Sequence, residues 1–406
     1  MCLFLGGSAK QFADLFIYLA YFCFVKQRLL LFDTILDGHH PEYLIHLIGY
    51  YSSRPEVDVI VATGASFHAA FAKRQAAEQL VWGENIQFYP IEDQLIVKGN
   101  IFLRSLREWN LMLAIAKEMD ATQAVLMYMD YFPLGAILGK KAAIPIAGIS
   151  FRPPQQIQGA FDFIKHKIWQ SMLASGQIST VFSLVHAAVP VINTLANCNR
   201  ALALADPVIQ LPVSATQIAD FRLRYGIPSD KKIYLNFGQL DQRKGIEAFL
   251  IACKQLSGSD LRAMCLLLAG PIESNYAAKI DQLLEELPDL QVVKLYDYLH
   301  YPTVELCFEV ADVVLVTYQG HLGMSSVLIR AALVGKPVIG TCHGTIGATI
   351  DAYELGRSID PANGFEFAQA LQGALHTNAA KQAELVRQNS VEAFTLTIAQ
   401  GIESSY

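Results

Sequence analysis

Residues 231–253 read KKIYLNFGQLDQRKGIEAFLIAC, and this stretch contains the pattern that decides the fold. The apolar run Lys232–Phe237 predicts a buried strand, and the apolar residues between Ile246 and Cys253 recur at helical spacing. A glycine-containing turn joins the two. A strand that leads through a tight turn into a helix is the repeating unit of a parallel sheet. The stretch therefore predicts one βα unit of an α/β domain.

The same alternation of apolar strand and helix patterns continues through the rest of the chain. Strands are predicted at Leu29–Asp33, Val57–Ala62, Ala124–Met129 and Ile144–Ile149 in the first half, and at Lys232–Phe237, Met264–Ala269, Gln291–Leu295, Asp312–Val316 and Pro337–Thr341 in the second half. These runs are nearly continuous in apolar residues, as the strands of a parallel sheet with two covered faces are. The predicted fold class is α/β, with two doubly wound Rossmann-like domains that face a central cleft.

Four parts of the chain are expected. Residues 1–25 form an extension outside the fold or a membrane-surface segment, 26–200 the first domain, 201–378 the second domain, and 379–406 a C-terminal helix that crosses back to the first domain. The apolar segment Phe12–Val25 contains Asp14 and is shorter than the roughly 20 apolar residues that a membrane-spanning helix needs. A signal peptide is the weaker alternative, because no small-residue cleavage site follows this segment.

Composition excludes several classes of protein. The chain has 406 residues, of which 53% are hydrophobic and 17% charged, so it is not a disordered chain. The formal net charge of −6 and the lack of a Lys/Arg block argue against binding to nucleic acid, where affinity depends on neutralising phosphates. The seven cysteines form no C-x-x-C pair, which predicts reduced, buried thiols, a reducing compartment and no structural zinc.

The first candidate site follows the strand Lys232–Phe237. Open parallel sheets bind ligands beyond the carboxyl ends of their strands, and Gly238, Arg243 and Lys244 come at that point. Two cations ahead of a helix oppose its dipole, so an ordinary charged first turn explains them less well than an anion site does. The pair predicts binding of a diphosphate, and we expect both side chains to be exposed at the cleft.

A second turn of the same kind follows the strand Asp312–Val316. Its candidate ligand-binding residues are Gly320, His321, Gly323, Ser325 and Ser326. Backbone N–H groups and hydroxyls at such a helix start can hold phosphate oxygens. A glycine- and serine-containing loop alone is a weak signal, but its position opposite the Arg-Lys pair favours a shared site.

The first domain offers fewer candidates. His39 and His40 lie in a turn on the expected ligand edge, where they could bind a phosphate or a sugar hydroxyl or move a proton near neutral pH, or could simply cap and pack. Asp130 follows a strand and could be a catalytic carboxylate, could bind a sugar hydroxyl, or could cap the next helix. Arg152 could clamp an anion or face solvent.

Five segments of the second half resemble the nucleotide-sugar-binding domain of GT-B fold glycosyltransferases, in particular glycosyltransferase family 4. They are NFGQLDQRKGIEAFLIAC, LLLAGPIE, VADVVLVTY, AALVGKPVIG and ELGRSIDP, in the order and spacing of that family. The resemblance implies a nucleotide-sugar-binding second domain and an acceptor-side first domain. It also implies sugar transfer from a nucleotide-diphosphate sugar to an unidentified glycan, lipid or small-molecule acceptor. Arg243 and Lys244 would hold the diphosphate, with no tightly bound cofactor or metal.

The chain departs from the family at one pair of positions. The family carries two glutamates eight residues apart, and here those positions hold Leu322 and Arg330. The resemblance therefore supports the fold more strongly than a retaining mechanism. Two alternatives stay open: a nucleotide-sugar epimerase, and a non-catalytic GT-B fold binding protein. A cytoplasmic location is expected, with peripheral contact at the inner face of the membrane if the acceptor is a lipid.

Overall fold

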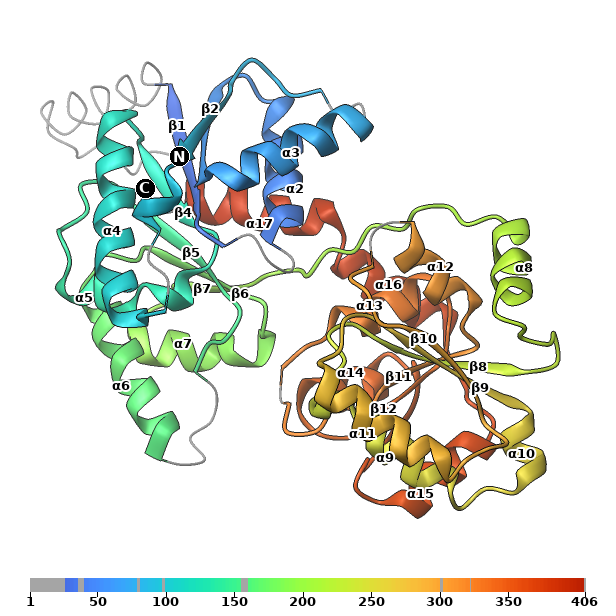
Figure 1. Ribbon diagram of the computed structural model, residues 1–406. Coiled ribbons are helices and arrows are strands. Elements are labelled where there is room, and N and C mark those ends of the chain that lie inside the picture. Colours follow the sequence, from blue (N-terminus) through green and yellow to red (C-terminus); the bar gives the residue numbers. More distant parts are fainter. Residues whose placement is uncertain are drawn as a thin grey trace, which may run out of the picture. The chain divides into compact units, whose positions relative to one another are not determined.

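The structure of the chain is a computed structural model that describes residues 26–35, 40–78, 81–96, 99–154, 160–299, 302–321 and 323–404. The predicted extension 1–25, together with Gly38, His39 and Leu322, lies outside the described residues. The chain divides into two compact units (Figure 1). Unit 1 contains residues 1–204 and 395–406, and unit 2 contains residues 205–394.

The described part of unit 1 contains a parallel sheet of seven strands in the order β3-β2-β1-β4-β5-β6-β7. The strands are β1 (Gln27–Asp33), β2 (Val57–Gly64), β3 (Ile86–Ile91), β4 (Gln123–Leu126), β5 (Ile146–Ser150), β6 (Thr180–Ser183) and β7 (Ala201–Ala203). Because β2 lies on one side of β1 and β4 on the other, the strand order reverses between β1 and β4. In doubly wound sheets, ligands bind at this switch point.

Helices cover both faces of this sheet. They are α2 (His40–Ser52), α3 (Ala65–Glu78), α4 (Ile101–Glu118), α5 (Pro133–Leu138), α6 (Ala160–Ala174) and α7 (Val189–Ala196). Leu30 and Phe32 of β1 pack in one core with Trp109 of α4 and Trp169 of α6. The intervening Leu31 is also fully buried, so both faces of the strand are covered. This explains why the middle of β1, from Leu29 to Phe32, is a continuous apolar run.

The described part of unit 2 contains a six-stranded parallel sheet in the order β10-β9-β8-β11-β12-β13. Its strands are β8 (Lys232–Phe237), β9 (Met264–Ala269), β10 (Gln291–Leu295), β11 (Val313–Val316), β12 (Val338–Thr341) and β13 (Gly356–Ile359). Its helices are α8 (Ala215–Arg224), α9 (Ile246–Cys253), α10 (Gly258–Arg262), α11 (Ser274–Glu285), α12 (Thr303–Val310), α13 (Ser326–Leu333), α14 (Gly344–Ala352), α15 (Gly364–Gln372) and α16 (Ala379–Gln388). The strand order reverses between β8 and β11, which therefore form the switch point of unit 2.

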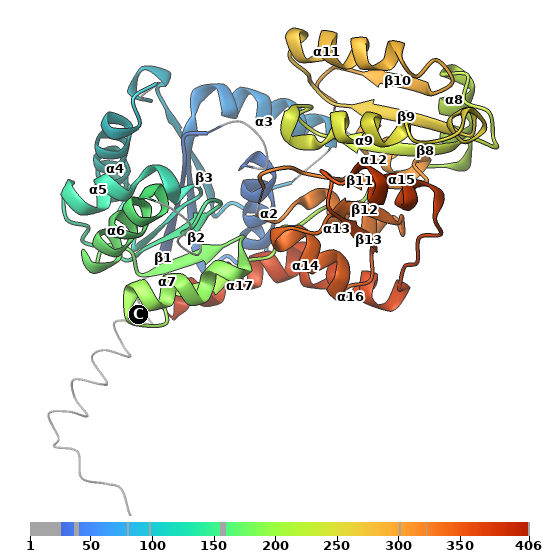
Figure 2. The ribbon, with the colours of Figure 1, turned by 90° about the horizontal axis from the view of Figure 1, so that it is seen from below.

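The C-terminal segment forms two helices. Helix α16 is separated from α17 (Val391–Glu403) by a break at Asn389 and Ser390. The end of α17 belongs to unit 1, where Thr180 Oγ1 donates a 3.2 Å hydrogen bond to the carbonyl of Gly401. Figure 2 shows the red ribbon of α17 within unit 1. Of the helices that the structure describes, none combines the length and the apolar character needed to cross a membrane.

The end of β4 and the burial of two cysteines differ from the sequence prediction. The strand predicted to reach Met129 ends at Leu126, because Met129–Tyr131 form a 3₁₀ turn. The predicted burial of the cysteines is confirmed for Cys253, Cys265 and Cys307, whereas Cys198 and Cys342 are exposed.

Candidate functional site

The candidate ligand site of unit 2 lies where β8 and β11 end. The chain leaves β8 into a 3₁₀ turn, Gln242–Lys244, and then enters α9. Backbone bonds join this turn to the segment after β11, since the amide of Gln319 donates to the carbonyl of Arg243 at 2.8 Å. The hydroxyl of Thr317 also donates to the carbonyl of Lys244, at 3.3 Å. The two predicted turns are therefore brought together, as their position after neighbouring strands requires.

Gly245 permits this close approach. Its φ is +73°, and a Cβ at this position would lie 2.2 Å from the carbonyl oxygen of Thr317. Any other residue would both strain the backbone and clash with backbone atoms. The Arg-Lys-Gly order thus fixes the two cations in a turn that is packed against the end of β11.

Lys244 is buried, so the expectation that it is exposed is wrong. It is 5% exposed, and its Nζ donates to the carbonyl of Phe237 at 2.8 Å and to the hydroxyl of Tyr318 at 2.5 Å. Nζ also lies 4.3 Å from the centre of the Tyr318 ring. Gly238 leaves room for this arrangement, because it has φ +105° and no Cβ, and the ammonium lies in the space that a Cβ would restrict.

Arg243 has a different environment. Its side chain is 40% exposed, and its Nη2 lies 3.8 Å from Asp241 Oδ2. Its guanidinium carbon lies 5.4 Å from the centre of the Tyr318 ring. One fixed, buried cation and one accessible cation therefore lie beside the same aromatic ring.

The second turn supplies His321 and Ser325. His321 Nε2 lies 3.2 Å from the carbonyl of Met324. Burial lowers the pKa of His321, and the charges of Arg243 and Lys244 lower it further against the opposing effect of the Met324 carbonyl. These effects favour the neutral imidazole. Ser325 precedes α13, and its hydroxyl lies 3.1 Å from that of Tyr318.

Two buried oxygen acceptors accompany these cations. Asn236 donates from Nδ2 to the carbonyl of Lys244 at 3.1 Å, but its Oδ1 has no hydrogen-bond partner within the described part of the chain. The same holds for Asp241 Oδ1. Buried acceptors are normally satisfied. Cations next to unsatisfied acceptors suit a ligand that has both an anionic group and hydroxyl donors.

Arg330 does not replace the family glutamate in a ligand-facing role. It is 9% exposed, and its Nη1 donates to Glu305 Oε1 of α12 at 2.8 Å. Burial raises the pKa of Glu305, while the guanidinium of Arg330 opposes that rise. The pair therefore joins α13 to α12 inside unit 2.

In unit 1, Asp130 holds the end of β5. Its Oδ1 accepts a 2.7 Å hydrogen bond from the hydroxyl of Ser150, and its Oδ2 accepts from the amides of Phe151 and Arg152 at 2.8 and 3.1 Å. Desolvation raises the pKa of Asp130, against these three hydrogen bonds. The side chain spans two neighbouring strand ends and does not cap a helix. The backbone of His40 begins α2, and Arg152 is exposed.

Sequence reasoning missed a charged cluster at the switch point of unit 1. Thr34, just after β1, donates to Glu108 Oε2 at 2.6 Å and accepts from Arg104 Nη2 at 3.0 Å. Arg104 also lies 3.1 Å from Glu108 Oε1 and 4.4 Å from the centre of the Tyr131 ring. A signal was present, because Glu108 occupies the apolar face of α4 four residues after Arg104. A charge at a core position is unexpected unless it is paired.

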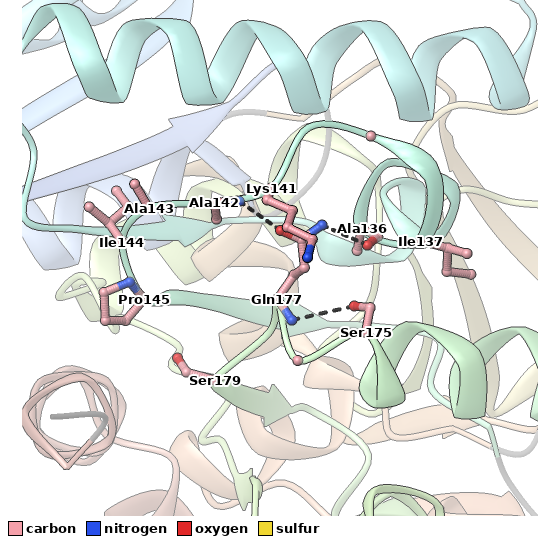
Figure 3. A pocket seen from close by; sticks show the side chains of 12 residues that line it. Ala136, Ile137, Lys141, Ala142, Ala143, Ile144, Pro145, Ser175, Gln177 and Ser179 are labelled. Carbon is pink, nitrogen blue, oxygen red and sulfur yellow. Dashed lines mark hydrogen bonds between the residues drawn. The ribbon is translucent and has the colours of Figure 1, made fainter.

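A hollow of about 670 Å³ lies at the other edge of the unit 1 sheet (Figure 3). The segments that lead into β5 and β6 line it, and Gln177 bridges them by accepting from the amide of Ala142 at 2.7 Å and donating to the carbonyl of Ala136 at 2.9 Å. This is the amino-terminal edge of the strands. The hollow contains none of the predicted site residues. In the described ranges, no group of three or more His, Cys, Asp or Glu residues is placed to hold a metal ion.

These features define a protein of two doubly wound α/β units with two cations, Arg243 and Lys244, at the switch point of the second. The family model described as "Glycosyl transferases group 1" matches residues 217–392, which cover β8 to β13 and that site. The second half of the chain therefore resembles this group, as the sequence predicted. None of the curated proteins matches the sequence significantly.

Solved structures show the same fold over nearly the whole chain. HepE of Anabaena, in complex with UDP and glucose, has 16% identity and a TM-score of 0.68, covering 93% of this chain and 100% of its own. Sucrose-phosphate synthase of Thermosynechococcus elongatus has 16% identity and a TM-score of 0.69, with coverages of 93% and 98%. A glycosyltransferase of Rickettsia africae has 15% identity and a TM-score of 0.69, with coverages of 94% and 99%. The GT-B type α/β fold is thus confirmed.

Proposed function

We propose that the chain is a glycosyltransferase that moves a sugar, a hexose in the simplest case, from a nucleotide-diphosphate sugar to an acceptor. The observation that carries the proposal is the placement of Arg243 and Lys244 at the switch point of a domain that matches glycosyl transferases group 1. HepE, which shares the fold, was solved with UDP and with UDP-glucose. UDP or a related nucleoside diphosphate is therefore the first donor to test.

The site residues divide the work of donor binding. Arg243 and Lys244 would offset the negative charge that grows on the diphosphate as the sugar leaves, which is the charge that a preorganised site stabilises best. Gly320 leaves its backbone open to close approach, because nothing lies within 4 Å of where its Cβ would be, whereas Lys244 Nζ lies beside Gly238 and His321 Nε2 beside Gly323. Ser326 begins α13. Because Arg243 and Lys244 supply two positive charges there, the proposal includes no resident metal or cofactor.

Two buried acceptor oxygens beside the cations would bind hydroxyl groups of the donor. Asn236 Oδ1 and Asp241 Oδ1 are positioned next to the cations and lack donors within the described residues. A sugar or ribose hydroxyl could supply those donors. This would replace, in part, the acceptor role that the family glutamates would have had at positions 322 and 330.

The acceptor side is assigned to unit 1. We propose that His39 or His40 meets the acceptor or moves its proton, and that Asp130 shapes the adjoining turn through its bonds to Ser150 and Phe151. A glycan, a lipid or a small molecule are the acceptor classes. They would place the chain in polysaccharide or glycolipid biosynthesis at the cytoplasmic side, with peripheral membrane contact if the acceptor is a lipid.

A second candidate is a non-catalytic nucleotide-sugar-binding protein. One observation favours it: Arg330 is committed to Glu305, so the position of the second family glutamate offers no carboxylate to a ligand. Such a protein would bind the donor without cleaving it.

Thermal unfolding of the full chain tests donor binding. UDP, GDP and ADP and their glucose conjugates are screened, and a ligand that binds only the folded chain should add about 2.7 kcal/mol at roughly 100 times its dissociation constant. The stabilising nucleotide sugar is then followed for slow hydrolysis without acceptor. Stabilisation with hydrolysis supports the transferase, and stabilisation without hydrolysis or transfer supports the binding protein. No stabilisation by any compound contradicts both.

A further inference from the structure

Tyr318 lies just after β11 in unit 2, and neither the family resemblance nor the sequence pattern gives its side chain a role. The residue is 4% exposed, and its hydroxyl contacts two polar side chains. It accepts from Lys244 Nζ at 2.5 Å and lies 3.1 Å from the hydroxyl of Ser325. A buried tyrosine hydroxyl usually has one partner that satisfies it, and here it links a cation to the start of α13.

The ring of Tyr318 acts on the same cation. Lys244 Nζ is 4.3 Å from the ring centre, which is within the range of a cation–π interaction. The carbonyl of Phe237 takes another of its N–H donors at 2.8 Å. An ammonium has three N–H donors, so one remains without an acceptor among the described residues.

These contacts fix an otherwise flexible side chain. A lysine side chain has four rotatable bonds and loses considerable rotamer freedom when it is ordered. Here that ordering is present before any ligand binds, because the ring, the hydroxyl and a carbonyl together determine where Nζ lies. Ser325 in turn fixes the hydroxyl of Tyr318.

We propose that Tyr318 is the positioning residue of Lys244, and that it holds the ammonium at the Gly238 turn with one N–H directed to the diphosphate of the donor. This inference rests on the proposed function for the identity of the ligand. The placement of Lys244 by Tyr318 is a property of the free protein and can be tested without a ligand.

The first experiment measures acetylation of Lys244 by acetic anhydride, read by mass spectrometry, in the wild type and two variants. Tyr318→Phe keeps the ring and removes the hydroxyl. Tyr234→Phe is the matched control, because it also removes a buried hydroxyl bond in unit 2, the 3.0 Å bond to the carbonyl of Leu371. Lys244 should react several-fold faster in Tyr318→Phe only. Equal rates in the two variants would overturn the inference.

The second experiment measures affinity for UDP and for inorganic pyrophosphate by calorimetry. Tyr318→Phe should bind both about tenfold more weakly, the loss expected for one hydrogen bond to a charged group, and should bind uridine unchanged. In a Lys244→Met background the same change should cost nothing further, since Tyr318 acts through Lys244. Losses that add fully in the double variant would contradict this coupling.

The two experiments separate the two claims. A wild-type chain that binds neither UDP nor pyrophosphate contradicts the proposed function, and the acetylation rates then decide the positioning role alone. Binding by the wild type with no effect of Tyr318→Phe leaves the proposed function intact and overturns the positioning role.

Discussion

Arg330 donates a 2.8 Å hydrogen bond to Glu305, and the two side chains are only 11% and 3% exposed. Arg330 thereby joins α13 to α12. In the glycosyltransferase family that the chain resembles, a glutamate stands at this position. Removing one member of a buried ion pair leaves the other charge uncompensated, which typically costs about 3–5 kcal/mol. Each of the two charges should therefore depend on the other for the stability of unit 2.

Arg330→Met should lower the free energy of unfolding by about 3–5 kcal/mol in urea titrations. The double variant Arg330→Met/Glu305→Leu should recover most of that loss, because no unpaired charge remains. Lys381→Ala is the control, since it breaks an exposed pair with Glu354 and should cost less than about 1 kcal/mol. A double variant as unstable as Arg330→Met would show that the loss does not come from an unpaired Glu305 carboxylate.

Gly245→Ala should be far more harmful than Gly320→Ala. Both glycines have a positive φ, +73° and +62°, so both substitutions strain the backbone by about 1 kcal/mol. Only at Gly245 would the new Cβ meet backbone, at 2.2 Å from the carbonyl of Thr317, whereas nothing lies within 4 Å at Gly320. Urea unfolding of the two variants measures the difference. Equal losses would mean that the turn can move away from β11.

His321 predicts a pH dependence. Its pKa in the folded chain is below the ordinary value of 6.5, first through burial and then through Arg243 and Lys244. The unfolded chain therefore binds the proton more readily, so the stability contributed by neutral His321 is present above about pH 6.5 and is lost as the pH falls below it. The wild type should lose stability relative to His321→Gln between about pH 7.5 and 5.5. A constant difference across that range would contradict the shift.

Asp130→Ala tests the structural role of Asp130. Alanine accepts none of the hydrogen bonds from Ser150, Phe151 and Arg152, so the variant should lose about 1–3 kcal/mol of the free energy of unfolding. Asp130→Asn should lose less, because its Oδ1 can accept from both amides while its Nδ2 donates to the hydroxyl of Ser150. If Asp130→Ala leaves the free energy of unfolding unchanged while abolishing turnover, Asp130 acts in the reaction and not in holding the turn.

The sequence predicted some strands with their bounds and missed others. Burial does not separate the two groups, because β10 is a half-exposed edge strand that was predicted and β6 is a buried strand that was not. Strands β8, β9 and β10 have the predicted bounds, because their apolar runs and flanking turns are unambiguous. The strands β3, β6, β7 and β13 were not predicted. The edge strand β3 contains Pro90 and is largely half-exposed, so it lacks the apolar run. Strand β13 begins with Gly356. A Cβ at this position would lie 2.1 Å from the carbonyl oxygen of Val338, so a glycine stands where an apolar strand residue would be expected.

The candidate site was predictable in position but not in detail. A parallel sheet brings the carboxyl ends of its strands to one edge, so the turns that contain Arg243 and Ser325 could be expected at the same edge. The burial of Lys244 could not, because it depends on the ring of Tyr318, which is 74 residues away along the chain. The cluster of Thr34 and Glu108 depends in the same way on a contact over 74 residues.

The most direct test of donor binding is a calorimetric titration of the full chain with UDP-glucose and with UDP, in the wild type, Arg243→Ala and Arg262→Ala. Arg262 is the matched control, an exposed arginine paired with Asp289. Wild type and Arg262→Ala should bind equally, and Arg243→Ala should bind at least about tenfold more weakly with an unchanged melting temperature. Unchanged affinity in Arg243→Ala, or no binding by the wild type, would contradict a diphosphate site at the junction of β8 and β11.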